Sequence, residues 1–533
     1  MVLMPEWLAR RAYLSPQAPA LFFGGRTYTF AELNEEAERA ACALRAALAE
    51  ARARHPAESD ALTTDAAGRP LRVGPRVAVL LPNSPDFVVV VHALAKAGAV
   101  LVPLNVRLAP GEMAWQVQDA EAALLIYDET YAEKAQAVAS LLGEAAPRLL
   151  DVAELRAAAG FQQVPDRGEA GAPPRTHVDL DEVHSILYTS GTTGRPKGAL
   201  LTYGNHWWSA VGSALNLGLA AGDRWLACVP LFHVSGLSIL FRSVLYGIPV
   251  VLHPRFDPEA VNRAIDEDGV TLLSVVAAML DRMLDAKGGQ RYPPSLRAVL
   301  LGGGPAPEAL LRRAAAAGMP VLQTYGLTET ASQAATLAPA DALVRIGSAG
   351  KPLFPTEVRV VVEDEAGSRR WAAPGEAGEI VVRGPTVTVG YWRRPDATAE
   401  KFRDGWFHTG DVGFLDADGY LYVLDRRDDM FVSGGENVYP AEIEAVLREH
   451  AAVADAGVVG VPDATWGRVP AAAVVLRPGA SATAEELALF CRQRLAGYKV
   501  PKQFAFVAAL PRNAAGKLLR RELTGLFAGG TAP

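Results

Sequence analysis

The most constraining feature of this chain is a regular alternation of strand-like and helix-like segments that starts near residue 76. Residues 76–82 (RVAVLLP) form a short apolar run, and residues 84–104 have the length of a helix that leads into a further strand. The pattern repeats with a strand-like run at 123–128 and a helix-like segment at 132–145. Such β/α alternation predicts mostly parallel sheets that are covered by helices.

The pattern changes after about residue 344. Short alternating strands separated by turn signals occupy residues 356–367, 378–385 and 418–425, which predicts an antiparallel, barrel-like section. A charged stretch at 425–430 (DRRDDM) then precedes a second, shorter β/α pattern. A chain of 533 residues exceeds what one core usually supports, so at least two domains are expected.

The predicted fold class is therefore mixed α/β, with a large N-terminal domain of two α/β subdomains plus the barrel-like section, and a small C-terminal α+β domain. The simplest boundary lies at 425–428, which leaves roughly 100 residues for the second domain. Residues 50–74 are polar and punctuated by proline and glycine, so we expect a surface insertion there and assign it no function.

Charge and cysteine content exclude several classes of protein. Lys and Arg total 52 against 59 Asp and Glu, and no basic block stands out, so binding to nucleic acid or to a membrane surface is not expected. Cys42, Cys228 and Cys491 are far apart and odd in number, which implies neither a disulfide framework nor a zinc site. The apolar stretch at 77–104 is interrupted by polar residues, so we expect no membrane span and a cytoplasmic location.

A loop rich in glycine and hydroxyl residues follows a strand-like run in residues 186–200 (ILYTSGTTGRPKGAL). Its glycines let backbone N–H groups converge on one point, and its hydroxyls add donors, which suits phosphate oxygens. The spacing is not that of a Walker A loop, because Lys197 follows a proline and precedes a glycine. An ordinary surface loop is the alternative for this segment taken alone. The residues predicted to contact phosphate are Thr189, Ser190, Gly191, Thr192, Thr193, Gly194 and Lys197.

Four further motifs follow this loop: QTYGLTET at 323–330, HTGD at 408–411, DRRDDMFVSGGENVYPAEIE at 425–444 and PRNAAGKLLRREL at 511–523. In order and spacing, the five motifs resemble those of the adenylate-forming superfamily, which includes acyl-CoA synthetases, peptide-synthetase adenylation domains and luciferases. The resemblance covers essentially the whole chain. It implies a large N-terminal domain at 1–425, a hinge at 426–428 and a mobile C-terminal domain at 429–533.

Segments between these motifs resemble one subfamily. PLFHVSGLSIL at 230–240, LLGGGPAPEALL at 300–311 and RIGSAGKPLF at 345–354 look like the o-succinylbenzoate:CoA ligases of menaquinone biosynthesis. The resemblance implies an ATP-dependent conversion of o-succinylbenzoate to o-succinylbenzoyl-CoA through an acyl-adenylate, with release of pyrophosphate and then AMP. ATP, Mg²⁺ and coenzyme A are the implied cofactors and co-substrates.

The resemblance also assigns the catalytic residues. Lys517 matches the family lysine that bridges the substrate carboxylate and the α-phosphate, where a cation offsets the repulsion between two anions. Glu329 matches the residue that helps to hold Mg²⁺, and an oxygen ligand suits this hard cation. Thr328 matches a hydrogen-bond donor to the α-phosphate. Without this context, Lys517 would be read as a surface lysine and Glu329 as a helix-capping acid.

The predicted nucleotide site needs a flat slot for adenine and an acceptor for the ribose. Backbone without side chains at 302–304 suits one face of the base, and Tyr325 supplies a ring for stacking, with a core aromatic as the alternative. Asp411 matches the ribose carboxylate, and Arg426 is a second contact. The remaining predicted nucleotide contacts are Gly302, Gly303, Gly304, Pro305, Gln323, Thr324 and Gly326.

The second half-reaction implies a moving C-terminal domain, because Lys517 must withdraw before the thiol can reach the adenylate. The resemblance places the hinge at Asp428, in a polar segment that can absorb a backbone rotation. It places Ser433, Gly434 and Gly435 along the tunnel for the pantetheine arm of coenzyme A. An ordinary turn is the alternative for the glycine pair.

o-Succinylbenzoate carries two carboxylates, and the aromatic one must be recognised without reacting. An arginine can do this by bidentate hydrogen bonding, and Arg242 is the candidate because it shares a helical face with Ser235 and Ser238. A solvated face is the alternative. His233 matches the acyl-pocket histidine of the family, and Ser332 follows the magnesium motif closely enough to reach the substrate.

The sequence alone leaves three other functions open. The first is a CoA ligase for a medium-chain fatty or aryl acid, and the second is a module that loads a carrier protein. The third is a nucleotide-binding scaffold without catalysis, against which the joint presence of Glu329, Asp411 and Lys517 argues. The expected partners are a small carboxylate, ATP and coenzyme A, and the sequence leaves open whether the protein forms a homo-oligomer.

Overall fold

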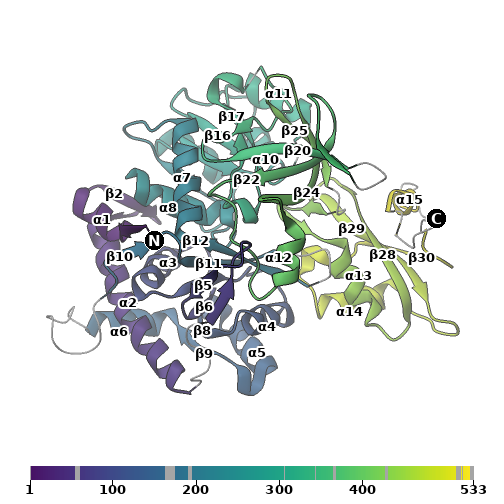
Figure 1. Ribbon diagram of the computed structural model, residues 1–533, viewed down its shortest axis with the longest axis horizontal. Helices are drawn as coiled ribbons and strands as arrows, with labels where there is room; N and C mark the ends of the chain where they lie inside the picture. The colour runs from purple at the N-terminus through teal and green to yellow at the C-terminus, as the bar shows by residue number, and fades with distance from the viewer. Residues whose placement is uncertain are drawn as a thin grey trace. The chain divides into compact units, whose positions relative to one another are not determined.

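The structure is a computed structural model, and it describes residues 2–54, 61–161, 174–189, 195–304, 306–342, 344–363, 368–426, 430–511, 518 and 520–527. The chain forms two compact units. The larger one contains Met1–Val106, Val117–Leu187 and Gly198–Asp425, and the smaller one contains Arg107–Gln116, Tyr188–Lys197 and Arg426–Pro533. Figure 1 follows the chain from the purple N-terminus to the yellow C-terminus.

The first sheet has six strands in the order β12-β11-β7-β6-β8-β9. The strands are β6 (Arg76–Leu80), β7 (Val100–Pro103), β8 (Ala122–Tyr127), β9 (Arg148–Asp151), β11 (Val183–Thr189) and β12 (Lys197–Thr202). Parallel pairing joins β7, β6, β8 and β9, with α3 (Pro85–Ala97) as the crossover between β6 and β7. Ser84 caps the start of α3, and Gly98 ends it with a φ of 74°, which favours glycine. The predicted β/α architecture is confirmed.

The second sheet has nine strands in the order β19-β18-β17-β16-β15-β13-β14-β2-β3. They are β2 (Pro19–Phe23), β3 (Arg26–Thr29), β13 (Trp225–Ala227), β14 (Val250–Leu252), β15 (Leu272–Val275), β16 (Ala298–Leu301), β17 (Val321–Tyr325), β18 (Ala335–Thr336) and β19 (Lys351–Pro352). The strands from β17 to β2 run parallel, and antiparallel strands close both edges. The sheet therefore combines a parallel centre with N-terminal strands that join at one edge.

The third sheet of the larger unit is antiparallel, as predicted for the section after residue 344. Its strands are β20 (Glu357–Glu363), β21 (Arg369–Trp371), β22 (Gly378–Arg383), β23 (Phe402–Arg403), β24 (Trp406–Leu415) and β25 (Leu421–Arg426). Inward residues such as Val358 and Val360 alternate with exposed residues along β20, so one face of the sheet covers a core.

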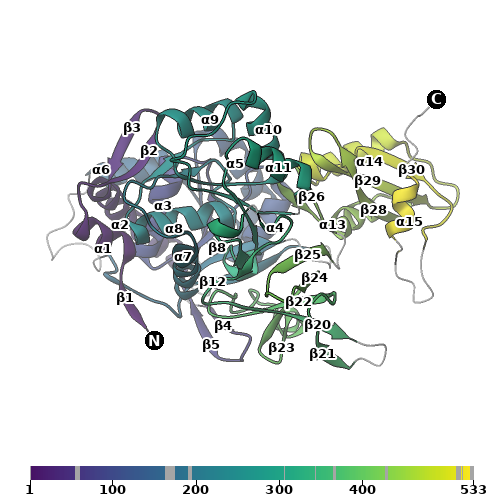
Figure 2. The same cartoon turned by 90° about the horizontal axis from the view of Figure 1, so that it is seen from above.

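Helices cover the sheets of the larger unit and fill the connections. They are α1 (Trp7–Leu14), α2 (Phe30–Arg54), α5 (Ala132–Leu142), α6 (Val152–Phe161), α7 (Tyr203–Leu217), α8 (Val234–Tyr246), α9 (Pro258–Glu267), α10 (Ala277–Lys287), α11 (Glu308–Ala316) and α12 (Pro395–Lys401). Helix α4 (Pro110–Asp119) belongs mostly to the smaller unit, which contains Arg107–Gln116. Two short pairs complete the unit: β1 (Leu3–Pro5) with β10 (His177–Asp179), and β4 (Ala61–Thr64) with β5 (Pro70–Val73). The β4–β5 hairpin lies within the polar segment at 50–74 and is seen from above in Figure 2.

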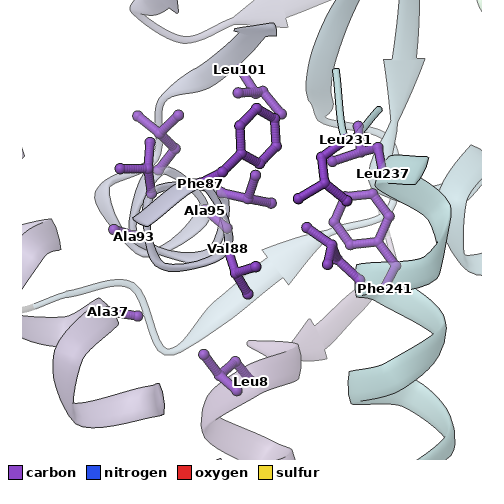
Figure 3. Close-up of a cluster of buried hydrophobic side chains, with 14 of the residues drawn as sticks. Leu8, Ala37, Phe87, Val88, Ala93, Ala95, Leu101, Leu231, Leu237 and Phe241 are labelled. Carbon is purple, nitrogen blue, oxygen red and sulfur yellow. The ribbon is translucent and has the colours of Figure 1, made fainter. Parts of the chain in front are cut away.

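The main core of the larger unit lies where α3 meets α8. Phe87 and Val88 on α3 belong to one apolar cluster with Leu231, Leu237 and Phe241, the last two on α8 (Figure 3). All five side chains are buried. Because α3 packs on the first sheet and α8 on the second, burial of this apolar surface holds the two α/β layers together.

The smaller unit has a three-stranded sheet of β28 (Val453–Asp463), β29 (Gly467–Leu476) and β30 (Gln503–Phe506), and a hairpin of β26 (Phe431–Ser433) and β27 (Glu436–Val438). Helices α13 (Pro440–Arg448) and α14 (Ala484–Arg492) cover one face through Ile443 and Leu487. Helix α15 (Arg520–Gly525) covers the other face through Leu523 (Figure 1). Among the described residues, no helix is both long and apolar enough to span a membrane.

Candidate active site

The candidate site of the larger unit lies at the carboxyl ends of two neighbouring parallel strands. β16 ends at Leu301, directly before the three glycines at 302–304, and β17 ends at Tyr325, directly before Gly326 and a short 3-10 helix, Thr328–Thr330. The strands pair through Leu301 and Gln323. The carboxyl ends of parallel strands meet at one edge of a sheet, where ligands of α/β proteins bind. The predicted adenine and magnesium motifs therefore lie beside each other.

The turn after β17 has a conformation that the sequence explains. A Cβ atom on Gly326 would lie 1.6 Å from the carbonyl oxygen of Ser332, so only glycine fits there. Ala331 and Ser332 have φ angles of 50° and 99°, in a region that non-glycine residues rarely occupy. Ser209 on α7 donates a 2.6 Å hydrogen bond to the carbonyl oxygen of Ala331 and so supports the strained turn.

Tyr325 and Asp411 form a hydrogen bond with each other. Tyr325 is predicted to stack on the adenine, and Asp411 is predicted to bind the ribose. The Tyr325 hydroxyl donates a 2.7 Å hydrogen bond to Oδ2 of Asp411, and both residues are buried. The backbone around Asp411 is fixed by Glu379, which accepts a hydrogen bond from the amide of Gly410 at 3.1 Å and contacts Nδ1 of His408 at 3.0 Å. No local pattern around Glu379 predicts this supporting role. The Asp411 carboxylate thus accepts a hydrogen bond from Tyr325, and the backbone directly before it is held by Glu379.

Glu329 is buried, and one segment, residues 388–392, provides two of its hydrogen bonds. The backbone amide of Thr388 donates a 2.7 Å hydrogen bond to the carbonyl oxygen of Glu329, and the Tyr391 hydroxyl donates one of 2.9 Å to Oε1. Sequence reasoning identified Glu329 but not Tyr391, because nothing near Tyr391 in the sequence suggests a polar partner.

A magnesium ion fits these residues. Within the described ranges, no group of three His, Cys, Asp or Glu side chains could hold a metal by itself. Mg²⁺ in phosphate-transfer sites is usually bound by one or two carboxylates together with substrate phosphates, so a single oriented carboxylate such as Glu329 is sufficient. When bound, the ion would neutralise charge on the triphosphate.

Arg242 on α8 is buried, with 2% of its surface exposed, so the solvated face that the sequence left open is wrong. Its Nη2 donates a 2.9 Å hydrogen bond to Oε1 of Gln333, and its guanidinium carbon lies 5.1 Å from the centre of the Trp225 ring. Burial lowers the pKa of this guanidinium, although arginine stays charged in proteins. The Tyr246 hydroxyl is a second polar neighbour, and in the described part of the chain no carboxylate forms an ion pair with Arg242.

The other predicted acyl-site residues flank Arg242 along the chain. His233 immediately precedes α8, and its ring centre lies 4.6 Å from that of Phe232. Ser332 is half-buried in the strained turn, directly before Gln333. Gln333 in turn donates a 2.8 Å hydrogen bond to the Thr336 hydroxyl, which orients its amide oxygen toward Arg242.

Gln323 and Thr324, two of the predicted nucleotide contacts, form hydrogen bonds within the protein. The Gln323 side chain donates to the carbonyl oxygen of Ser348 at 3.0 Å. The Thr324 hydroxyl donates to the carbonyl oxygen of Ala335 at 3.0 Å and contacts the Thr336 hydroxyl at 2.8 Å. Their predicted roles toward ATP stay predictions.

Several predicted residues belong to the smaller unit or lie outside the described residues. Thr189 ends β11 and Lys197 begins β12, with a 3.4 Å hydrogen bond from the Thr189 hydroxyl to the carbonyl oxygen of Lys197. Arg426 ends β25. The residues outside the described ranges are Ser190, Gly191, Thr192, Thr193, Gly194, Pro305, Asp428 and Lys517.

The predicted coenzyme A segment forms the turn between β26 and β27. Ser433 pairs with Glu436, and between them Gly434 and Gly435 have φ angles of 57° and 87°. A two-residue hairpin turn with two positive φ angles strongly favours glycine. The turn alone therefore explains both glycines, and their suggested role in a tunnel stays a prediction.

Comparison with known proteins gives the family of this chain. The AMP-binding enzyme family matches residues 67–392, and the AMP-binding enzyme C-terminal domain matches residues 442–517. The chain is 52% identical over 527 residues to the 2-succinylbenzoate–CoA ligase of Geobacillus kaustophilus (strain HTA426), with 99% of each chain covered. It is 48% identical over 524 residues to the enzyme of that name from Geobacillus sp. (strain WCH70), with 98% of each chain covered.

Solved structures of o-succinylbenzoate CoA synthetase (MenE) from Bacillus subtilis are also similar. A double mutant bound with the product analogue OSB-NCoA has a TM-score of 0.86 and 42% identity, covering 98% of this chain and 99% of that one. The complex with the acyl-adenylate intermediate OSB-AMP has a TM-score of 0.70 and 41% identity, covering 100% and 99%. This chain therefore belongs to the AMP-binding enzyme family, and it is similar over its whole length to members named 2-succinylbenzoate–CoA ligase.

Proposed function

We propose that this protein converts o-succinylbenzoate, ATP and coenzyme A into o-succinylbenzoyl-CoA, AMP and pyrophosphate. In the first step, a substrate carboxylate oxygen attacks the α-phosphorus of ATP and the bond to pyrophosphate breaks. In the second step, the thiol of coenzyme A loses its proton, its sulfur attacks the acyl carbon, and AMP leaves. Relatives named for this ligation support the proposal, as do the solved B. subtilis complexes with OSB-AMP and with ATP and magnesium.

In the first step, we assign the nucleotide to the edge formed by β16 and β17. Backbone at 302–304 and the Tyr325 ring would border the adenine, and Asp411 would accept hydrogen bonds from the ribose hydroxyls. Thr328 would donate to the α-phosphate, and Glu329 would hold the magnesium ion. The loop at 190–194 and Lys197 would contact the phosphates, and Lys517 would bridge the two reacting anions.

The choice of acid depends on one observation: Arg242 is buried and charged, and its side-chain neighbours Gln333 and Tyr246 carry no negative charge. A buried cation without a carboxylate partner is costly, so an anionic substrate group would stabilise it. o-Succinylbenzoate has a carboxylate to spare, whereas a fatty acid does not. We therefore assign the non-reacting carboxylate to Arg242, with His233 and Ser332 as neighbouring contacts.

For the second step, we assign the hinge to Asp428 and divide the chain into residues 1–425, 426–428 and 429–533. Rotation at the hinge would withdraw Lys517 and bring the turn Ser433–Gly434–Gly435 to the path of the pantetheine arm. We further propose that the reaction takes place in the cytoplasm.

The deciding experiment compares thioester formation from o-succinylbenzoate, benzoate and octanoate, with ATP, Mg²⁺ and coenzyme A present. We expect kcat/KM for o-succinylbenzoate to exceed that for either monocarboxylate by at least about 100-fold, because the Arg242 charge pair contributes about 3 kcal/mol. A preference for octanoate or benzoate would overturn the proposed substrate. Pyrophosphate release with o-succinylbenzoate but without coenzyme A would separate the adenylation step from the thioester step.

A further inference from the structure

The segment at 388–392 contacts both the backbone and the side chain of the predicted magnesium ligand. The amide of Thr388 bonds to the carbonyl oxygen of Glu329 at 2.7 Å, and the hydroxyl of Tyr391 bonds to Oε1 at 2.9 Å. Glu329 is 8% exposed and Tyr391 is 5% exposed. In such a buried place, a hydrogen bond from a neutral hydroxyl to a carboxylate is charge-assisted and fixes the rotamer of the acid.

The same segment is bonded to β12, the strand that directly follows the predicted phosphate loop. The amide of Leu200 donates to the carbonyl oxygen of Gly390 at 2.9 Å, and the amide of Trp392 donates to that of Gly198 at 2.8 Å. Between these two bonds, Ala199 and Tyr391 form an antiparallel bridge. One short segment therefore connects the strand after the loop with Glu329.

The backbone at Tyr391 is itself held by neighbouring residues. Gly390 has a φ of 144°, which only glycine adopts readily, and the Tyr391 amide donates a 3.0 Å hydrogen bond to the hydroxyl of Thr398 on α12. The Thr388 hydroxyl also donates to the carbonyl oxygen of Leu200 at 2.7 Å. Groups that orient a metal ligand act well only when they are themselves held rigidly, and Tyr391 meets this condition.

We propose that Tyr391 is a positioning residue that orients the Glu329 carboxylate toward the magnesium ion bound with ATP. This inference rests on the proposed role of Glu329 as the metal ligand. Tyr391 does not contact the reacting atoms in this account, and it acts through Glu329. Loss of such an outer partner typically lowers metal affinity or activity by about 10–100-fold.

The test is the Tyr391→Phe variant, which keeps the buried ring and removes only the hydroxyl. ATP affinity is measured by titration calorimetry, without acid substrate, over a series of Mg²⁺ concentrations and in EDTA. We expect the Mg²⁺ concentration at which half of the affinity gain is reached to rise about tenfold, with ATP affinity in EDTA unchanged. A Mg²⁺ dependence equal to that of the wild type would overturn the inference.

The matched control is Tyr292→Phe, because the Tyr292 hydroxyl also donates a 2.9 Å hydrogen bond to a buried side chain, Asn262. We expect this variant to lose similar stability and to keep the wild-type Mg²⁺ dependence. An equal shift in both variants would mean that Tyr391 has only a structural role.

A double-mutant cycle shows whether Tyr391 acts through Glu329. In a Glu329→Gln background, Tyr391→Phe should produce no further change in Mg²⁺ dependence, and a persistent tenfold change would contradict the inference. Failure of the proposed function has a different signature, since the wild type would then release no pyrophosphate from o-succinylbenzoate.

Discussion

Two buried cations in the larger unit differ in what surrounds them. Lys96 on α3 is 1% exposed, and its ammonium group lies 2.6 Å from Oε2 of Glu6, which is equally buried. Arg242 on α8 is buried to the same degree, but its hydrogen-bond partner Gln333 carries no charge. The charge of Lys96 is balanced within the protein, so its role is structural. We propose that the charge of Arg242 is balanced by an anionic group of the substrate.

Three buried histidines show what a weaker base does in the same core. His184 and His206 lie with their ring centres 5.0 Å apart, and both pack on Phe241. Burial lowers the pKa of His92 and His184 to about 3 and that of His206 well below its usual value. These imidazoles therefore stay neutral. Arginine cannot release its proton in this way, so Arg242 keeps its charge.

The largest expected effect is the loss of stability when the buried ion pair between Lys96 and Glu6 is removed. Lys96→Met leaves the Glu6 carboxylate buried without its cation, and we expect the free energy of unfolding to fall by about 3–5 kcal/mol in urea denaturation. The double variant Lys96→Met/Glu6→Gln should recover part of this loss, because no unpaired charge remains. A loss below about 1 kcal/mol in the single variant would show that the pair is not structural.

The second largest effect is the loss of activity when the charge of Arg242 is removed. Arg242→Leu should lower kcat/KM for o-succinylbenzoate by about 100-fold, which corresponds to roughly 3 kcal/mol, while turnover of octanoate stays near its wild-type level. Because no internal carboxylate loses a partner, we expect the free energy of unfolding to change by less than about 1 kcal/mol. A large loss of stability with unchanged substrate preference would place Arg242 in the same structural class as Lys96.

The pH dependence of stability sharpens the comparison further. The folded pKa of these histidines lies below the unfolded value of about 6.5, so the unfolded state takes up protons first. Stability should therefore fall as the pH drops from about 6.5 toward 3, by about 1.4 kcal/mol per pH unit for each histidine. In the variant His184→Leu, stability should fall less steeply with decreasing pH, by about 1.4 kcal/mol per pH unit. Urea denaturation at several pH values between 5 and 7 measures this slope. An unchanged slope would mean that His184 is already protonated in the fold.

The smallest effect concerns the turn that brings Gln333 to Arg242. Ser209→Ala removes the 2.6 Å hydrogen bond to the carbonyl oxygen of Ala331, and we expect KM for o-succinylbenzoate to rise about fivefold, equivalent to about 1 kcal/mol. The value of kcat should change little, since the reacting groups are not touched. Ser213→Ala on the same helix is the control, and an equal effect of both variants would contradict a specific role for Ser209.

Sequence reasoning identified the β/α architecture because its signals are local. The apolar run that became β6 and the segment that became α3 are complete in themselves, and capping by Ser84 and Gly98 can be read directly. The motif after β17 was also readable, since Gly326 and Glu329 lie within four residues of each other. Parallel pairing of β16 with β17 then brings it next to the glycines at 302–304.

The parts that escaped prediction depend on contacts between distant residues. Tyr325 bonds to Asp411 across 86 positions, and Tyr391 bonds to Glu329 across 62, so neither pair leaves a local pattern. The sequence suggested an arginine on a polar helical face, but it did not show that this face is buried. Burial is decided by the packing of α8 against other elements, which a helical period alone does not reveal.

The edge of the nine-stranded sheet has a consequence for the order of assembly. β2 pairs with β3 on one side and with β14 on the other, through Leu21 and Val250, so its second edge stays open until a segment 229 residues further along the chain is in place. Until then, β2 and β3 present an open backbone edge and the apolar side chains of Leu21 and Phe22. Such edges are prone to association with other chains, so we expect misassembly of this protein to start at β2 when β14 is not yet in place.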